Sequence, residues 1–118
     1  MRRRAICVSA VVVAALLGSL AAGIETLEQD AINHLIRFVE TSSCTFLRNG
    51  SEYDSRKAAD HIKQKYNYFG RRIHTADDFI AFAATKSELS GRPYLVRCGE
   101  GDEIPAAKWL RTTKLPQH

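Results

Sequence analysis

The chain has 118 residues, of which 17 are Lys or Arg and 13 are Asp or Glu, so its formal net charge is +4 at pH 7. This length is enough for one small domain with a single modest core and too short for two domains. The chain carries three cysteines and has no internal repeat or low-complexity linker.

The first 23 residues have the layout of a secretory signal peptide. Residues 2–4 are three arginines, residues 5–20 form an almost uninterrupted apolar run, and small residues follow up to Gly23. This order predicts cleavage between Ala21 and Ile24 and a location in the periplasm or outside the cell. An uncleaved membrane anchor is the alternative, because about 18 apolar residues can just span a bilayer. After cleavage we expect no stable membrane insertion.

Removal of residues 1–23 would also remove most of the positive charge. The predicted mature part, residues 24–118, keeps 14 basic residues against 13 acidic ones and forms a single globular domain. The basic excess of the whole chain therefore belongs to the predicted export signal. For this reason the net charge does not indicate a nucleic acid partner.

Two cysteines, Cys44 and Cys98, remain in the predicted mature domain. An even number of cysteines in an exported chain predicts a disulfide between them. Closing a loop of this length stabilises a domain by about 4 kcal/mol in the chain-entropy model. Two buried free thiols are the alternative.

Hydrophobic spacing and capping residues predict about four helices. The helices are expected to start at a capping box of Thr26 with Gln29, at Asp54 or Ser55, at a second capping box of Thr75 with Asp78, and near Pro105. The second helix is expected to end at Gly70. The apolar residues expected to face inward are Leu27, Ala31, Ile32, Leu35, Ile36, Phe38 and Val39, then Ala58, Ile62, Tyr66 and Phe69, then Ala76, Phe79, Ile80 and Ala83.

Strands are expected at residues 44–47 and 93–98, with a brief third strand at residues 51–53. The pair Asn49-Gly50 predicts a tight turn between the first two, because both residues tolerate positive φ. Helices and strands are not arranged as repeated βαβ units. The sequence therefore predicts an α+β fold in which about four helices pack on a small, mainly antiparallel sheet.

The mirrored positions of the two cysteines predict a register for the main strands. Antiparallel pairing with the cysteines opposite each other places Phe46 opposite Val96, a favourable aromatic and β-branched pair. It also places Arg48 opposite Tyr94, where a cation–π contact is expected. A one-residue offset, or a disulfide from a helix to a strand, is the alternative, because the geometry of a disulfide is restrictive.

Four short blocks of the chain resemble a known family. They are residues 46–50 (Phe-Leu-Arg-Asn-Gly), residues 59–62 (Ala-Asp-His-Ile) with Lys65, residues 75–80 (Thr-Ala-Asp-Asp-Phe-Ile) and residues 90–94 (Ser-Gly-Arg-Pro-Tyr). Together they resemble the YfeK-like family of small exported proteobacterial proteins, a domain of unknown function. The similarity extends from Ile32 to Trp109. It implies an exported single domain and supplies no activity and no catalytic residue.

One set of polar residues is expected near the Asn49-Gly50 turn and is our candidate ligand site. Its members are Arg48, Asn49, His61, Lys65, Ser90, Arg92 and Tyr94, with Ser87 beside them. Cationic and hydroxyl groups in one pocket would suit a small anion or a ligand that bears a carboxylate. The alternative is that the two arginines cover apolar surface with their stems while the serines cap and turn.

A small hydrolase-like enzyme is the alternative function. It would use Ser87 or Ser90 with His61 and a carboxylate such as Glu52 or Glu88. A nucleophile needs a base within hydrogen-bond reach, and the sequence has no nucleophile elbow and no catalytic cysteine pair. The four histidines show no spacing typical of a metal site. We therefore expect neither a metal nor another cofactor and lean toward a protein that is not an enzyme.

Residues 63–72 alternate basic and aromatic side chains, as anionic-surface binders do. At helical spacing Tyr66 and Phe69 are expected in the core. The basic residues of this segment are expected to form a solvated face: Lys63, Lys65, Arg71 and Arg72. An envelope protein or a small anionic ligand is thus the expected partner, and nucleic acid is not.

Overall fold

The computed structural model describes residues 23–116. The predicted signal peptide therefore lies, apart from Gly23, outside the described residues. Within the described part, no helix is both long and apolar enough to cross a membrane.

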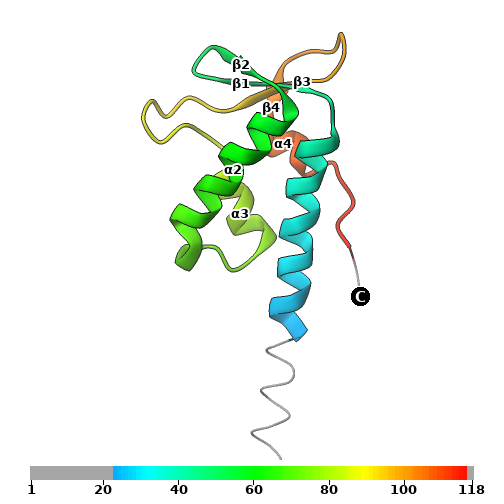
Figure 1. Cartoon of the computed structure of the whole chain (residues 1–118), viewed down its shortest axis with the longest axis vertical. Coiled ribbons are helices and arrows are strands. Elements are labelled where there is room, and N and C mark those ends of the chain that lie inside the picture. Colours follow the sequence, from blue (N-terminus) through cyan, green and yellow to red (C-terminus); the bar gives the residue numbers. More distant parts are fainter. Residues whose placement is uncertain (1–22, 117–118) are drawn as a thin grey trace, which may run out of the picture.

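The described residues form an α+β fold, as predicted. It contains an N-terminal helix, helical over residues 23–41, and then the following elements in order: β1 (Thr45–Arg48), β2 (Ser51–Tyr53), α2 (Ser55–Phe69), a 3₁₀ turn η1 (Gly70–Arg72), α3 (Ala76–Ala83), β3 (Leu95–Arg97), β4 (Ile104–Pro105) and α4 (Ala106–Leu110). The strands make one antiparallel sheet in the order β2-β1-β3-β4. The sheet lies across one end of the molecule, and the described helices extend from one side of it (Figure 1).

The predicted register of the two main strands is confirmed. Phe46 pairs with Val96 in the β1–β3 ladder. One step beyond this ladder, Cys44 and Cys98 form a disulfide with their Cα atoms 4.4 Å apart. At the other end of β1 the chain turns back into β2 through Asn49 at φ 52° and Gly50 at φ 81°. Positive φ at both central residues is the geometry of a type I′ hairpin turn, which explains the Asn-Gly pair.

The core lies between the helices and the inner face of the sheet. Phe46 and Val96 are buried on this face, because alternate residues of a strand point to the same side. Trp109 of α4 contacts Phe46 edge-on at 5.5 Å and stacks on Phe38 of the N-terminal helix at 4.4 Å. One indole ring therefore joins the sheet to two helices.

Two helix starts are capped as predicted. Asp54 accepts a hydrogen bond from the Lys57 amide at 2.8 Å at the start of α2. Thr75 and Asp78 form a complete capping box at the start of α3. The Glu28 carboxylate, from the N-terminal helix, accepts from the amide of Ala76 at 2.8 Å, so it binds the positive end of α3 across the interface.

Two sequence predictions about the first helix are wrong. Thr26 does not begin the first helix, because residues 23–25 are already helical. Leu27 is 38% exposed and lies outside the core. Gly70 ends α2 as predicted, and with φ −31° it leads through a right-handed turn into η1. The two-residue strand β4 gave no signal in the sequence, because its length is below any readable period.

The disulfide closes the segment that contains both main strands, α2 and α3, with a sequence separation of 54 residues. We expect the double substitution of Cys44→Ala and Cys98→Ala to lower the free energy of unfolding by about 2–4 kcal/mol. Urea unfolding with and without a reductant measures this loss. The reductant should lower the midpoint of the parent and leave that of the double variant unchanged; equal midpoints for the oxidised and reduced parent would contradict the prediction.

Candidate functional site

A cavity of about 290 Å³ lies between the β1–β2 hairpin and α2. Five of its lining residues are apolar and buried: Phe46, Ala58, Ile62, Ala84 and Ala106. Arg48, His61 and Tyr94 contribute polar groups to its wall, and exposed residues of α2, namely Lys57, Asp60 and Gln64, form part of its rim. The cavity therefore combines a buried apolar lining with polar side chains from β1, from α2 and from the segment before β3.

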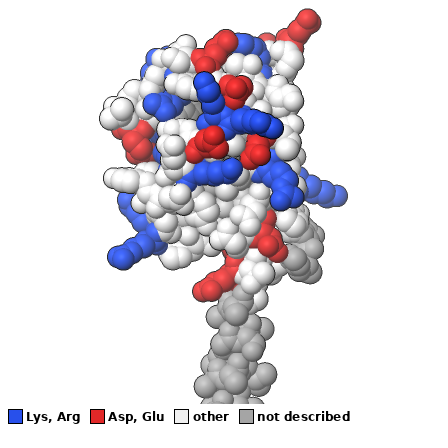
Figure 2. Space-filling view, viewed as in Figure 1, with Lys and Arg blue, Asp and Glu red and all other residues white. Residues whose placement is uncertain are grey.

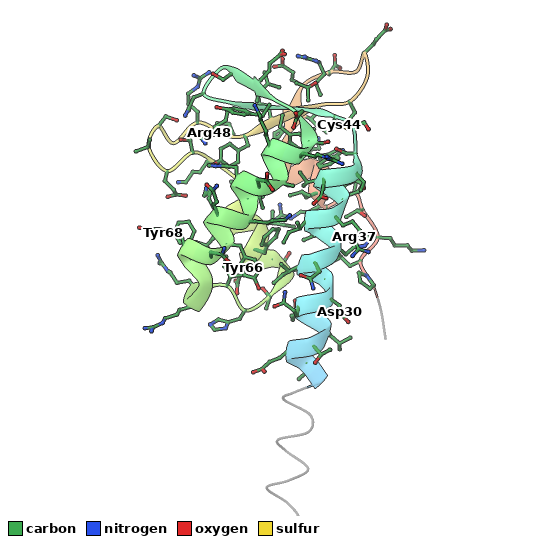
Figure 3. The ribbon with its side chains drawn as sticks, viewed as in Figure 1. Asp30, Arg37, Cys44, Arg48, Tyr66 and Tyr68 are labelled. Carbon is green, nitrogen blue, oxygen red and sulfur yellow. A yellow bond between two sulfur atoms is a disulfide. The ribbon has the colours of Figure 1, made fainter. Side chains whose placement is uncertain are left out.

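Arg48 enters the cavity wall because it is the last residue of β1 and shares the inner face of the sheet with Phe46. Figure 3 shows Arg48 and Cys44 toward opposite sides of the molecule. The Nη1 atom of Arg48 lies 3.1 Å from Nδ1 of His61, and its guanidinium lies 5.9 Å from the centre of the Tyr53 ring. Among residues 23–116, no carboxylate forms an ion pair with Arg48.

His61 lies on the side of α2 that faces the sheet. Its Nε2 atom is 3.1 Å from the hydroxyl of Tyr94. Burial lowers the pKa of His61 below its usual value of 6.5, and the charges of Arg48 and Lys65 lower it further. The geometry agrees with a neutral ring, because arginine has only donors and needs an unprotonated nitrogen to accept from it.

Lys65 lies one helical turn after His61 and is 8% exposed. Its ammonium donates to the carbonyl of Lys86 at 2.8 Å, to the hydroxyl of Tyr94 at 3.1 Å and to the Glu88 carboxylate at 3.4 Å. It also lies 4.9 Å from the centre of the Tyr94 ring. A buried ammonium is costly unless its protons are all bonded, and here three acceptors and one ring face satisfy it.

The loop that contains Glu88 is also tied to the hairpin turn. The Asn49 side chain donates to the Ser87 hydroxyl at 3.2 Å and accepts from the Ser90 hydroxyl. The loop closes on itself through the amide of Ser87, which donates to the Arg92 carbonyl at 3.0 Å. Asn49 and Lys65 therefore hold one loop from two sides.

The structure brings most of the predicted site residues together, in two adjoining networks. The first joins Arg48, His61, Tyr94 and Lys65, and the second joins Asn49, Ser87 and Ser90. The side chain of Arg92 is exposed, and this residue contributes through its backbone.

Two expectations about this region are wrong. Arg48 is not placed over the Tyr94 ring, because it reaches His61 and lies near the Tyr53 ring instead, while Lys65 occupies the face of Tyr94. Lys65 is also not part of a solvated face, since its ammonium is buried under the loop.

Sequence reasoning missed the floor of the cavity. Ala58 and Ile62 were predicted as buried helix positions, but Ala84 and Ala106 come from distant segments and gave no sign that they would line the same cavity. Small side chains at these positions leave the space open. In the sequence, both residues are distinguished only as alanines at the ends of predicted helices.

The side chains needed for a serine hydrolase are bonded elsewhere. The hydroxyls of Ser87 and Ser90 are hydrogen-bonded to Asn49, whereas His61 contacts Arg48 and Tyr94. Glu88 pairs with Lys65. Within the described range, no group of three or more metal-binding side chains is clustered.

The charges of the basic and aromatic segment, residues 63–72, are partly compensated. Lys63 pairs with Glu40 at 3.3 Å and approaches Asp60 at 3.9 Å. Arg72 lies 5.0 Å from the centre of the Phe82 ring. On the face seen in Figure 2, Lys and Arg are interspersed with Asp and Glu and form no continuous basic surface.

Comparison with known proteins gives a family without an assigned activity. The model of a family of unknown function, DUF5329, matches residues 26–117. The uncharacterised protein YfeK of Salmonella typhimurium is 33% identical over 74 residues, which cover 62% of this chain and 62% of that protein. No solved structure matches. These matches confirm the resemblance to YfeK-like proteins.

The depressed pKa of His61 predicts a pH dependence of stability. A histidine that is harder to protonate when folded contributes stability that is present above the usual pKa of 6.5 and is lost as the pH falls through the lower folded value. We therefore expect the free energy of unfolding to decrease more steeply between about pH 7 and pH 5 in the parent than in His61→Gln. Urea unfolding at several pH values measures both slopes.

The matched control for this experiment is His74→Gln. His74 is exposed, so this variant should keep the steeper slope of the parent. If His61→Gln and the parent lose stability in parallel, the neutral state of His61 in the folded protein is refuted.

Proposed function

We propose that this chain, which belongs to the DUF5329 family, is a non-catalytic binding module of the cell envelope that holds a small anionic ligand in the cavity between β1 and α2. The observation that carries the proposal is the position of the Arg48 guanidinium and its lack of an acidic partner among the described residues. Its guanidinium lies at the wall of an apolar cavity beside a neutral histidine, and no described carboxylate pairs with it.

A second arginine on the same sheet shows what a structural arginine looks like in this protein. Arg97 lies on the outer face, where its guanidinium binds Glu52 at 2.9 Å and Glu103 at 3.2 Å. Both terminal nitrogens of its guanidinium are therefore paired with carboxylates of the chain itself. Arg48, on the inner face, is half-buried without such a partner, and an arginine fork in this setting is suited to an incoming carboxylate or phosphate.

The local charge also favours an anion. Lys57 on the rim adds to the positive charge of Arg48, and the rim carboxylate Asp60 already lies 3.9 Å from Lys63. The lowered pKa of His61 favours its neutral form. An anion bound beside it would favour protonation of the ring and thereby gain a further donor.

The wall is held in place before any ligand binds. Tyr94 is 7% exposed, and its hydroxyl is fixed between His61 and Lys65. Lys65 in turn is fixed by the carbonyl of Lys86 and by Glu88. A preorganised wall lowers the ordering cost of binding, which supports a binding role for these residues.

The envelope location is the second part of the proposal. It is supported by the basic, apolar and small-residue sequence of the first 23 residues and by the disulfide between Cys44 and Cys98. Disulfides form and persist in oxidising compartments, so both features point to a place outside the cytoplasm.

Ligand-dependent thermal stabilisation tests the binding role. We expect the melting temperature of the parent to rise with at least one anion from a panel of carboxylates, inorganic phosphate and sulfate, because a ligand that binds only the folded state stabilises it. Arg48→Gln should lose this rise, at a cost in affinity of about tenfold or more, since a charge-assisted hydrogen bond contributes about 1.5–3 kcal/mol.

Arg37→Gln is the control, because Arg37 is an exposed arginine on the N-terminal helix and does not line the cavity. Its melting temperature should rise with the same anions as that of the parent. A parent protein that responds to no anion in the panel, or an Arg48→Gln variant that responds like the parent, would contradict the proposed function.

Export can be tested on the protein purified from its native cells. We expect the mature chain to begin between Ala22 and Ile24, so that mass spectrometry of the intact protein shows the loss of the first 21 to 23 residues. The protein should be released with the periplasmic fraction or the culture medium. An intact Met1 on protein that remains with the cytoplasmic fraction would contradict this part of the proposal.

A further inference from the structure

We infer that the ligand is an amphipathic monocarboxylate whose carboxylate binds Arg48 and whose apolar body fills the cavity over Phe46, Ala58 and Ile62. This inference rests on the proposed function and assigns the chemical class of its ligand. It comes from the separation of polar and apolar groups within the cavity.

The inner part of the cavity offers few groups that could recognise a polar ligand. The side chains of Phe46, Ala58, Ile62, Ala84 and Ala106 are each at most 8% exposed and carry no donor or acceptor. A sugar or another polyhydroxylated ligand would leave its hydroxyls without partners against this floor, which weakens its binding. An apolar body is instead stabilised there by the removal of its surface from water.

Three polar residues of the lining lie together in the same cavity. Arg48, His61 and Tyr94 are linked by hydrogen bonds, so their polar atoms lie within a few ångströms of one another. A ligand that satisfies both regions has a polar head at one end and an apolar body at the other. This asymmetry excludes purely hydrophilic anions as the best-fitting ligands.

The head group carries a single negative charge. Arg48 provides one planar fork, which matches the two oxygens of one carboxylate. The nearby Lys65 cannot supply a second free cation, because it is already bonded to the Lys86 carbonyl and to Glu88. The remaining cation of the lining, Lys57, is exposed on the rim, where solvent and salt screen its charge. A dianionic phosphate is therefore disfavoured relative to a carboxylate.

The volume limits the size of the body. At about 290 Å³ the cavity lies at the lower end of the range for ligand pockets, which is about 300–1,000 Å³. Taking about 30 Å³ of liquid volume per water-sized group, it holds roughly ten non-hydrogen atoms. A straight-chain carboxylate of about eight carbons has this size, and so does a small aryl carboxylate.

The test is a titration of the purified oxidised protein, followed by amide and arginine side-chain NMR signals. The probes are butyrate, hexanoate and octanoate, with 1-octanol as the uncharged analogue and inorganic phosphate as the hydrophilic anion. We expect the dissociation constant to fall about fourfold for each added methylene up to octanoate, the value for one buried CH₂ group. The largest shifts should lie at Phe46, Arg48 and Ala58, and 1-octanol should bind more weakly than octanoate.

Two variants separate the head from the body. Arg48→Gln should weaken octanoate about tenfold or more and leave 1-octanol nearly unchanged, since the alcohol makes no charged contact. Ala58→Leu adds a larger side chain to the floor and should weaken octanoate more than butyrate. The chain-length series in the parent needs no variant, so the inference stays testable even if Ala58→Leu folds poorly.

Two outcomes would overturn the inference, and they are distinguishable. Binding of phosphate or of all three carboxylates at Arg48 with equal affinity would refute the amphipathic ligand and leave the anion-binding function standing. The absence of any shift at Arg48 and His61 with every probe, together with no response in the wider anion panel, would refute both.

Discussion

The pairing of β1 with β3 is the constraint on which the rest of the structure depends. Because Phe46 lies opposite Val96, both side chains enter the core, and every second residue along β1 must point the same way. The same register places Cys44 where it meets Cys98 and places Arg48 over α2. A slip by one residue would exchange the faces of β1, separate the cysteines and move Arg48 to solvent. The disulfide therefore stabilises the register that also creates the cavity wall.

The burial of Lys65 has a different origin and a different consequence. An ammonium loses much hydration when buried, so it persists only where acceptors replace water. Lys86 and Glu88 supply these acceptors, and both belong to the loop that follows α3. Because Asn49 holds the same loop through Ser87 and Ser90, the loop is fixed without a hydrophobic core of its own. Leu89 at its tip is 94% exposed, which shows that polar bonds and not apolar burial hold it.

Sequence reasoning succeeded here where a local signal and a global requirement coincide. The Asn49-Gly50 turn and the capping box at Thr75 each specify a local geometry, and the mirrored cysteines predicted the register of β1 against β3. It failed where the outcome depends on packing between distant segments. Nothing local distinguishes a buried lysine with partners from a solvated one, and nothing in Ala84 or Ala106 indicates that both line one cavity. The composition of the site was therefore predictable in large part, while its depth and its apolar floor were not.

A purely structural role for Arg48, in which its aliphatic part covers apolar surface, does not explain the position of its guanidinium. Arginine stems often cover apolar surface while the guanidinium stays hydrated or pairs with a carboxylate, as Arg97 does on the outer face with Glu52. Arg48 covers apolar surface too, but its head turns toward His61, a group that can accept from it only while uncharged. Burial lowers the pKa of His61, and the charges of Arg48 and Lys65 lower it further, so protonation of the ring beside Arg48 is disfavoured. The hydrogen bond to a neutral imidazole leaves the positive charge of Arg48 without a counter-charge, which an anion in the cavity would supply. The half-buried guanidinium without a carboxylate partner among residues 23–116 is thus the physical argument for an anionic ligand.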